Sequence, residues 1–338
     1  MEESGISPED GGPARSELWM HADVSNVPIS FTRVSDGPVL GLREHEAIPV
    51  AVGSGTINDI VKRSAHERER PCMCVATAAS MDGYTAFGAS IEKDGLKQTL
   101  SCPAPRAVVA DLEVLKHAPE DMTASNYADL LGKVTSGADW LIAEALDTER
   151  IDPAGWSLVQ DYVRGWTDSP TGLRVGDHGS TGRLVEGLIL SGLGMQSSRT
   201  ASGAEHQFGH LWEMEGPGHD EGTPLSHGFK VGVGTVAIAA LYELVLERDL
   251  GDLDIESLRD SWPTRQTMER SVRAQHTSPD LKRGAVEQTL AKYISADELA
   301  QRLALLREQW PGLREKVRVQ DRSGRDFPTA AILLQKRT

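Results

Sequence analysis

The stretch that decides the fold is IPVAVGSGTINDIVKRSAHER, residues 48–68. Its apolar run at 48–52 is typical of a short buried strand, and the glycines that follow predict a tight loop. From residue 57 to 68 the apolar side chains recur at helical spacing, which predicts a helix. A strand, a glycine loop and a helix in this order indicate an α/β domain.

Two further strands are predicted, PCMCVAT at 71–77 and RAVVAD at 106–111. A long glycine-containing segment separates them, so we expect parallel strands. Beyond about residue 120 strand signals nearly vanish and helical periodicity takes over. The helical segments are 127–146, 180–195, 201–214 and 229–250. We therefore expect an α/β N-terminal domain followed by an all-helical C-terminal domain.

The chain length favours two domains. Its 338 residues exceed the ~250–300 residues at which a single hydrophobic core usually stops growing. Residues 1–20 are polar and rich in Gly, Pro, Ser and Glu, which predicts a disordered arm. The predicted boundaries are then 21–120 for the α/β domain and 121–338 for the helical domain.

The composition excludes some partners. Lysine and arginine number 35 against 50 acidic residues, a net charge of -15, and the basic residues form no stripe along which nucleic acid could bind. The N-terminus lacks the order of a signal peptide, and no uncharged stretch reaches the ~18 apolar residues of a membrane span. We expect a cytoplasmic protein with no nucleic-acid or membrane partner.

The cysteines indicate buried thiols. Only Cys72, Cys74 and Cys102 are present, an odd number that excludes a disulfide framework. The Cys-x-Cys pair could bind a soft metal, but no second cluster lies nearby, so plain buried thiols are the favoured interpretation.

Three histidines could meet at a metal. His206 and His210 lie four residues apart in GAEHQFGH and share one helical face, and His227 opens the next helical segment. Taken by spacing alone, surface or core histidines remain the commoner explanation, with imidazoles converging on a metal as the alternative.

An aspartate stands in an otherwise apolar helical segment. Asp129 in YADLLGK needs a cation or hydrogen-bond donors, because an unpaired buried carboxylate is costly. Lys133 is one turn away and could form a surface-type ion pair. The residues alone favour this pair over a metal.

Two loops could line a binding site. In Gly53, Ser54, Gly55 and Thr56 the backbone amides could meet a phosphate at a helix N-terminus, although an ordinary turn is commoner. The segment TAASMDGYTAFGAS, 77–90, gathers small hydroxylic residues around Asp82 after a strand. Such loops line sites at the carboxyl edge of parallel sheets, and an ordinary polar loop is an equal alternative.

Six segments together resemble the glycerol-1-phosphate dehydrogenase family, within the iron-containing alcohol dehydrogenase and dehydroquinate synthase superfamily. They run from about Val50 to Thr235 in the family's order. The segments are VAVGSGTINDIVK, ATAASMDGYTAFGASI, CPAPRAVVADLEVLKHAP, ADLLGKVTSGADW, SSRTASGAEHQFGH and HGFKVGVGT.

The resemblance implies a dehydroquinate synthase-like fold, with the substrate and a zinc, nickel or iron ion between the two domains. It implies Asp129, His206 and His227 as metal ligands, with zinc favoured. It places the pyrophosphate of NAD(P) on the loop Gly53, Ser54, Gly55, Thr56, and the nicotinamide ribose near Thr77 and Ser80. It sets Asp82 at the substrate near the metal, with Lys133 and His210 at the substrate or behind the ligands. Ser197, Arg199 and Ser202 would border the substrate pocket.

The chain departs from the family ahead of the GSGT loop. About 30 residues between the arm and this loop hold no convincing helix, whereas the family has a complete strand, helix and strand unit there. We therefore expect a truncated Rossmann-like parallel sheet, with the adenosine half of the cofactor pocket altered. Near the ligands, Ala128 replaces a glycine, and Phe229 with Lys230 replaces a polar pair.

The resemblance favours a metal-dependent NAD(P)-linked oxidoreductase that interconverts a small phosphorylated or polyhydroxylated ketone and its secondary alcohol. The alternative is a nicotinamide-independent lyase, dehydratase or isomerase on a phosphate- or phosphonate-bearing substrate, and a third hypothesis is a non-catalytic binding protein. We expect an anionic small-molecule substrate and a homodimer.

Overall fold

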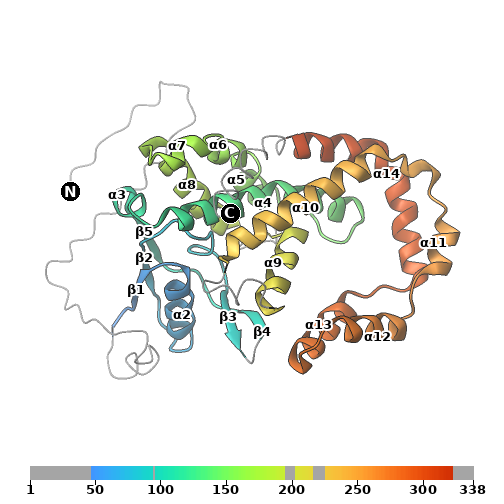
Figure 1. Ribbon diagram of the computed structural model, residues 1–338, viewed down its shortest axis with the longest axis horizontal. Helices are drawn as coiled ribbons and strands as arrows, with labels where there is room; N and C mark the ends of the chain where they lie inside the picture. The colour runs from blue at the N-terminus through green and yellow to red at the C-terminus, as the bar shows by residue number, and fades with distance from the viewer. Residues whose placement is uncertain (1–46, 94–95, 195–201, 216–224, 323–338) are drawn as a thin grey trace.

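A small parallel sheet at one end of the molecule is followed by helices (Figure 1). The computed structural model describes residues 47–93, 96–194, 202–215 and 225–322. The sheet has the order β1 (Val50–Gly53), β2 (Met73–Ala76) and β5 (Ala107–Ala110), all parallel. The helix α2 (Gly55–His66) follows β1 directly. The strand, loop and helix that open the chain's α/β part thus form as the sequence predicts.

The prediction that residues 48–52 form a buried strand is wrong. Val50 and Val52 are 48% and 56% exposed, and only Ala51 is buried. Among the described residues β1 pairs with β2 alone, so it lies at the sheet edge. Ile57 and Val61 of α2 pack against the cluster that contains Ala51, which covers only one face of the strand.

The segment between β2 and β5 holds an antiparallel hairpin that the sequence did not predict. Its strands are β3 (Ala89–Lys93) and β4 (Leu96–Leu100), with Ser90 opposite Thr99. The sequence EKDGLKQ at its centre is charged and lacks the alternation of apolar and polar residues that reveals a strand.

Beyond β5, every regular element in the described ranges is helical, as expected. The predicted segments 127–146, 180–195, 201–214 and 229–250 correspond to α4, α8, α9 and α10. The helices are α3 (Leu112–Leu115), α4 (Glu120–Ala145), α5 (Pro153–Val159), α6 (Val163–Thr167), α7 (Pro170–Arg174), α8 (His178–Gly194), α9 (Ala204–Glu215), α10 (His227–Glu247), α11 (Ile255–Ser261), α12 (Arg265–Gln275), α13 (Pro279–Lys292) and α14 (Ala296–Arg322), with a short 3-10 helix η2 (Leu250–Asp252).

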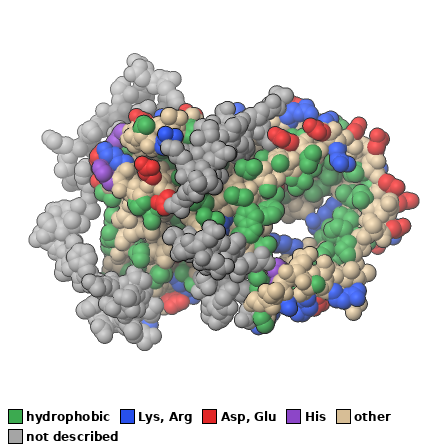
Figure 2. Space-filling model, viewed as in Figure 1, with side chains coloured by type: hydrophobic (Ala, Val, Ile, Leu, Met, Phe, Trp, Pro, Cys, Tyr) green, Lys and Arg blue, Asp and Glu red, His purple; other side chains and the backbone are tan. Residues whose placement is uncertain are grey.

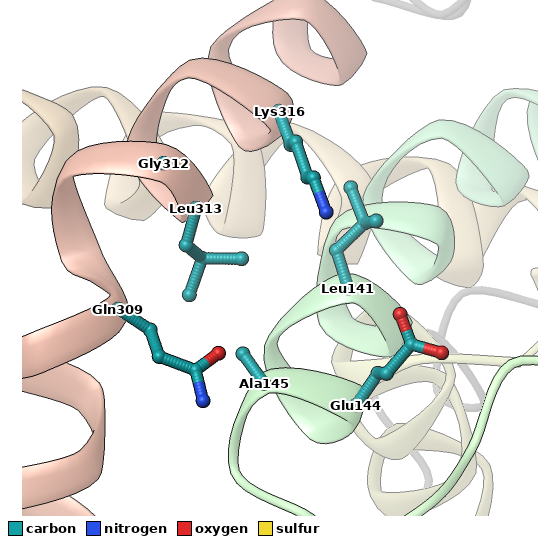
Figure 3. Close-up of a pocket in the computed structure, with 7 residues that line it drawn as sticks. All are labelled: Leu141, Glu144, Ala145, Gln309, Gly312, Leu313 and Lys316. Carbon is teal, nitrogen blue, oxygen red and sulfur yellow. The ribbon is translucent and has the colours of Figure 1, made fainter.

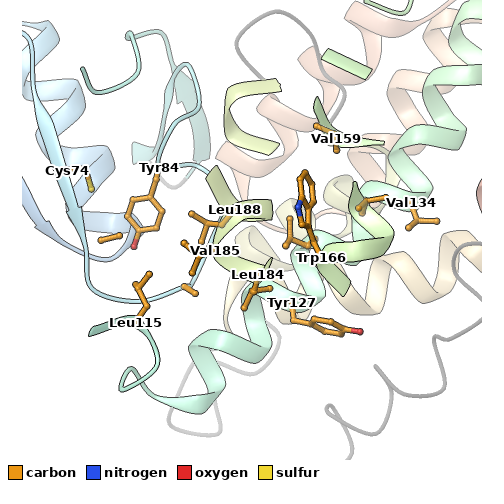
Figure 4. Close-up of a cluster of buried hydrophobic side chains, with 14 of the residues drawn as sticks. Cys74, Tyr84, Leu115, Tyr127, Val134, Val159, Trp166, Leu184, Val185 and Leu188 are labelled. Carbon is orange, nitrogen blue, oxygen red and sulfur yellow. The ribbon is translucent and has the colours of Figure 1, made fainter. Parts of the chain in front are cut away.

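One hydrophobic cluster joins the sheet to the helices. Figure 4 shows Cys74 of β2 and Tyr84 of the following loop on one side, with Leu188 of α8 and Trp166 of α6 on the other. The cluster continues across residue 120, where α4 begins. The division into domains at this residue therefore stays a prediction.

Helix α10 is apolar along its whole length and lies among other helices (Figure 1). By length and composition it could cross a membrane, but half of its most apolar stretch is buried inside the molecule. It packs against α4 and α9, and a second cluster that includes Ile238, Tyr242 and Trp310 joins it to α14. These contacts are those of a core helix.

Candidate active site and metal centre

Three helices bring the predicted metal ligands together. Asp129 comes from the middle of α4, His206 from the first turn of α9, and His227 is the first residue of α10. One possible ligand atom from each lies within 4.8 Å of the others. Asp129 and His206 are buried and His227 is half-buried. The fold therefore brings these three side chains together, which their spacing in the sequence could not establish.

A close crossing of α10 over α4 places His227. A Cβ at Gly228 would collide with the carbonyl oxygen of Ser125, so glycine is needed for this approach. The hydroxyl of Ser226 donates to that of Ser125 at 2.8 Å, which ties the start of α10 to α4. The contacts of Ser226 and Gly228 with Ser125 therefore fix the position of His227, which lies between them.

The start of α9 is held by an acid from α4. The Oδ2 of Asp139 accepts a hydrogen bond from the Ala204 amide at 2.6 Å, and its Oδ1 accepts one from the hydroxyl of Tyr242 in α10. Burial raises the pKa of Asp139. This side chain therefore joins α4 to α10 and to the start of α9.

Asp129 has the properties expected of a metal ligand. It is fully buried, and neither carboxylate oxygen has a hydrogen-bond partner among the described residues. Nε2 of His206 and Nζ of Lys133 lie 3.2 Å and 3.7 Å from its Oδ1. Burial raises the pKa of this carboxyl, but Lys133 and His206 outweigh burial and hold the pKa well below its usual range. An ionised carboxylate with unused lone pairs fits a cation.

The charges around the triad also fit a divalent ion. The carboxylates of Asp82 and Asp129 lie beside the ammonium of Lys133, and that of Glu205 lies beside His206. Burial alone would lower the pKa of His206, but Asp129 and Glu205 outweigh it and raise the pKa to about 9. A divalent cation bound by the three residues would take the place of the proton on His206 and offset the carboxylate charge.

The surface-type ion pair predicted for Lys133 is wrong. Lys133 is fully buried, and its Nζ lies 2.6 Å from Oδ2 of Asp82, closer than to Asp129. Burial would lower the pKa of the ammonium, but Asp129 and Asp82 outweigh it and raise the pKa. The hydroxyl of Ser191 also donates to Asp82, at 3.3 Å. Lys133 therefore connects Asp82, the other predicted catalytic residue, to the predicted metal ligand Asp129.

The third predicted catalytic residue is also close. His210 is half-buried, with its ring centre 6.3 Å from that of His206 and 5.8 Å from that of His227. Of the predicted substrate residues, Ser202 is half-buried two residues before α9. Ser197 and Arg199 lie outside the described residues.

The predicted cofactor loop has the expected local geometry. Gly53 ends β1 and Gly55 opens α2, where a Cβ would collide with the Met81 side chain. Ser54 precedes the helix without capping it through its side chain, and the Thr77 amide donates to the Gly53 carbonyl at 3.2 Å. Thr56 is exposed and Ser80 half-buried. A helix N-terminus at the carboxyl end of a parallel strand favours an anion.

Three polar residues of α2, which the sequence analysis did not single out, hold the loop that carries Asp82. Nζ of Lys62 donates to the carbonyls of Gly83 and Ala86 at 3.3 Å and 3.2 Å, and it lies 3.2 Å from Asp59. The amide of Asn58 donates to Gly83 at 3.4 Å. Asn58, Asp59 and Lys62 lie on one face of the helix, and this spacing in INDIVK could have revealed them in the sequence.

A separate cavity lies between α4 and α14 and measures about 290 Å³ (Figure 3). Its polar side chains, Glu144, Gln309 and Lys316, stand around Leu141 and Leu313. None of the predicted site residues lines it. This cavity is therefore separate from the predicted metal site.

Comparison with known proteins gives matches in sequence. The family model for iron-containing alcohol dehydrogenase matches residues 31–119. A glycerol-1-phosphate dehydrogenase (NAD(P)+) of Bacillus velezensis is 39% identical over 219 residues, which cover 64% of this chain and 55% of that protein. The enzyme of that name from Pyrococcus furiosus is 32% identical over 196 residues, covering 57% and 55%. The chain spans about half the length of the curated relatives it matches.

Among solved structures, the "probable glycerol dehydrogenase" of Sinorhizobium meliloti 1021 superposes with a TM-score of 0.53 at 18% identity. The superposition covers 84% of this chain and 81% of that one. At this identity the match shows the fold alone. It confirms the expected fold class, and the sequence matches confirm the resemblance inferred from the motifs.

Proposed function

We propose that this chain, a relative of the glycerol-1-phosphate dehydrogenases in the iron-containing alcohol dehydrogenase family, is a metal-dependent NAD(P)-linked oxidoreductase. Its substrate pair would be a small phosphorylated or polyhydroxylated ketone and the corresponding secondary alcohol. The observation that carries the proposal is the convergence of Asp129, His206 and His227, in which both oxygens of the buried Asp129 lack hydrogen-bond partners among the described residues.

Asp129, His206 and His227 would hold the ion through one oxygen and two nitrogens. This donor set suits zinc, nickel or ferrous iron, and we favour zinc. A divalent ion bound there supplies Lewis-acid chemistry to a substrate oxygen. Because the protein offers three ligands, room for a substrate oxygen would remain.

The neighbouring side chains would orient the substrate and handle the proton. Lys133 keeps its proton at Nζ between Asp82 and Asp129, so it can donate a hydrogen bond without losing charge. Asp82 is held by Lys133 and Ser191 and would face the substrate. His210, whose ring lies 5.8 Å from that of His227, is the group we assign to exchange a proton with the substrate oxygen.

The cofactor would enter at the carboxyl edge of the sheet. We assign Gly53, Ser54, Gly55 and Thr56 to the pyrophosphate, supported by the helix N-terminus that begins there. Thr77 and Ser80, in the loop after β2, would approach the nicotinamide ribose. Because the same loop carries Asp82, it would set the nicotinamide beside the substrate.

The substrate would be small and anionic, with Ser197, Arg199 and Ser202 at its pocket. Glycerol 1-phosphate is the substrate in the names of the relatives, so it and dihydroxyacetone phosphate are the first compounds to test. We also place the protein in the cytoplasm, where NAD(P) is supplied.

A second candidate function is a nicotinamide-independent lyase, dehydratase or isomerase. It is favoured by the sheet edge, because Val50 and Val52 of β1 are exposed among the described residues, beside the loop that would hold the cofactor. In this alternative the same metal ligands would stabilise an enolate from a phosphate- or phosphonate-bearing substrate.

Cofactor binding separates the two candidates. The zinc-loaded full chain is titrated with NADH and with NADPH while nicotinamide fluorescence is followed, and dihydroxyacetone phosphate is then added. Saturable binding and oxidation of the reduced nicotinamide support the dehydrogenase. If neither nucleotide binds up to millimolar concentration, the dehydrogenase proposal fails and the lyase is favoured.

Metal analysis tests the ligand assignment directly. We expect one zinc per wild-type chain and much less in Asp129→Ala and His206→Ala. His178→Ala is the matched control, because His178 is an exposed histidine on α8. Unchanged zinc content in both ligand variants would refute the assignment.

We propose a homodimer as the assembly. Exposed apolar side chains follow one face of α10, and Figure 2 shows hydrophobic side chains gathered along this helix. The stripe contains Val233, Val236, Leu241 and Leu244. Exposed apolar patches of this kind mark contacts between proteins. Light scattering on the wild type and on Leu241→Glu measures the mass, and a monomeric wild type would contradict the proposal.

A further inference from the structure

Glu205 is a buried acid to which the proposed reaction assigns no role. It is the second residue of α9 and is fully buried. Its Oε2 accepts a hydrogen bond from the hydroxyl of Thr135 at 2.9 Å, and its Oε1 accepts one from the Gly203 amide at 2.7 Å. Oε1 also lies 2.8 Å from Nδ1 of His206. These donors compensate a buried charge that would otherwise be costly.

The contact with Nδ1 determines which ring nitrogen of His206 is free. Both oxygens of Glu205 already act as acceptors, Oε1 from the Gly203 amide and Oε2 from the Thr135 hydroxyl. An ionised carboxylate only accepts hydrogen bonds, so Nδ1 must carry the hydrogen. In the neutral ring the lone pair is then on Nε2, which lies 3.2 Å from Oδ1 of Asp129.

We infer that Glu205 is a positioning residue of the metal centre, which holds the ring of His206 with Nδ1–H toward the carboxylate and Nε2 toward the ion. This inference rests on the metal site proposed above. A carboxylate behind a ligating imidazole fixes ring orientation and strengthens the ligand, and losing it typically lowers metal affinity by ~10–100-fold.

The competing explanation is that Glu205 only stabilises the start of α9. Asp139 provides a matched control, because it too is a mostly buried acid at this helix start. Among the residues that the structure describes, it accepts its hydrogen bonds from the Ala204 amide and the Tyr242 hydroxyl, and His206 is not one of these donors. A purely structural role would make Asp139 and Glu205 equivalent for the metal.

Two substitutions separate charge from hydrogen bonding. Glu205→Gln keeps an oxygen that can accept from Nδ1–H and removes the charge. Glu205→Met keeps a similar length and removes the acceptor. Asp139→Asn is the control that weakens the helix start without touching the imidazole. Circular dichroism verifies that each variant folds.

The first measurement needs no metal. Imidazole ¹⁵N chemical shifts are recorded on the metal-free full chain at pH 10, with the His206 signals assigned by their loss in His206→Ala. We expect the Nδ1–H tautomer in the wild type, in Glu205→Gln and in Asp139→Asn, and a mixture of tautomers in Glu205→Met. Retention of the pure Nδ1–H tautomer in Glu205→Met would overturn the inference.

The second measurement is zinc affinity, by competition with a chromophoric chelator. We expect losses of about tenfold in Glu205→Gln and up to about 100-fold in Glu205→Met, with no change in Asp139→Asn. If Asp139→Asn and Glu205→Gln lose equal zinc affinity, the role of Glu205 is structural and the inferred positioning role is refuted. If Glu205→Met does not fold, the test rests on Glu205→Gln, and an unchanged zinc affinity in that variant also refutes the inference. A wild type that binds no zinc would refute the proposed function, while the tautomer measurement would still decide the role of Glu205.

Discussion

Lys133 and Asp82 form a buried ion pair, with 2.6 Å between Nζ and Oδ2, that connects the middle of α4 to the loop after β2. Lys133 is fully buried and Asp82 is only 6% exposed. The contact joins the helical part of the molecule, which carries the proposed metal ligands, to the loop expected to meet the nicotinamide. The geometry of the site therefore depends on a charge pair that water barely reaches.

Breaking this pair from one side should destabilise the protein strongly. We expect Asp82→Asn and Lys133→Met each to lower the free energy of unfolding by about 3–5 kcal/mol, because each removes one member of a buried ion pair and leaves the other member buried. The double variant should lose less than the sum of the single losses. Urea unfolding followed by circular dichroism measures all three.

The exposed pair of Arg273 and Glu269 is the control for that experiment. Replacing Arg273 by Met should cost no more than about 1 kcal/mol, since water screens an exposed pair. Strictly additive losses in the Asp82 and Lys133 double variant would show that the two side chains do not interact energetically.

The contacts of Lys62 should control the order of the loop that carries Asp82. Lys62→Met removes the donor to the carbonyls of Gly83 and Ala86 and leaves Asp59 without its ion pair. We expect faster amide hydrogen exchange in residues 83–90, because these carbonyls are no longer held. Exchange is followed by mass spectrometry, and wild-type protection of this segment in a folded Lys62→Met variant would argue against the assignment.

The thiols should be unreactive in the folded protein. Cys72, Cys74 and Cys102 are free and buried, and burial raises the pKa of Cys74 to about 12. A thiol reagent at pH 8 should therefore label them only after denaturant is added, since the thiolate is the reactive form. Rapid labelling of any of them in the native protein would contradict their burial.

The same thiol predicts the sign of a pH effect on stability. The folded-state pKa of Cys74 is raised above its ordinary value of 9.0, so the folded protein binds this proton more tightly than the unfolded chain. The stability contributed by the protonated thiol is complete below pH 9 and is lost as the pH rises toward 12. Thermal unfolding of the wild type and of Cys74→Ala across this range measures it, and a loss of equal size in both would remove Cys74 as the cause.

Two glycine substitutions should have opposite effects. Gly228→Ala puts a Cβ against the Ser125 carbonyl, so we expect a loss of about 1–3 kcal/mol of stability and weaker zinc binding through displacement of His227. At Gly312 a Cβ would meet nothing within 4 Å, and alanine in this helix should stabilise by up to about 1 kcal/mol. Equal changes in melting temperature would contradict the close crossing of α4 and α10.

The regular elements could be predicted from the sequence because their signals are local. The apolar spacing in residues 229–250 predicts α10, and the glycines after Val52 mark the end of β1. The hairpin of β3 and β4 was not predicted, because its centre is charged and its apolar and polar residues do not alternate. The metal ligands needed the family's motif, since spacing alone favoured surface histidines.

Apart from the hairpin β3 and β4, the sequence by itself determined that a parallel α/β part is followed by helices, and the family motifs indicated the residues that we propose as metal ligands. Tertiary structure alone decided that Lys133 pairs with Asp82 inside the protein, that Val50 and Val52 are exposed, and that Glu205 lies behind His206. Burial and charge pairing depend on which distant segments pack together. A residue's neighbours along the chain specify its helix or strand, but they do not specify the helix that will cover it.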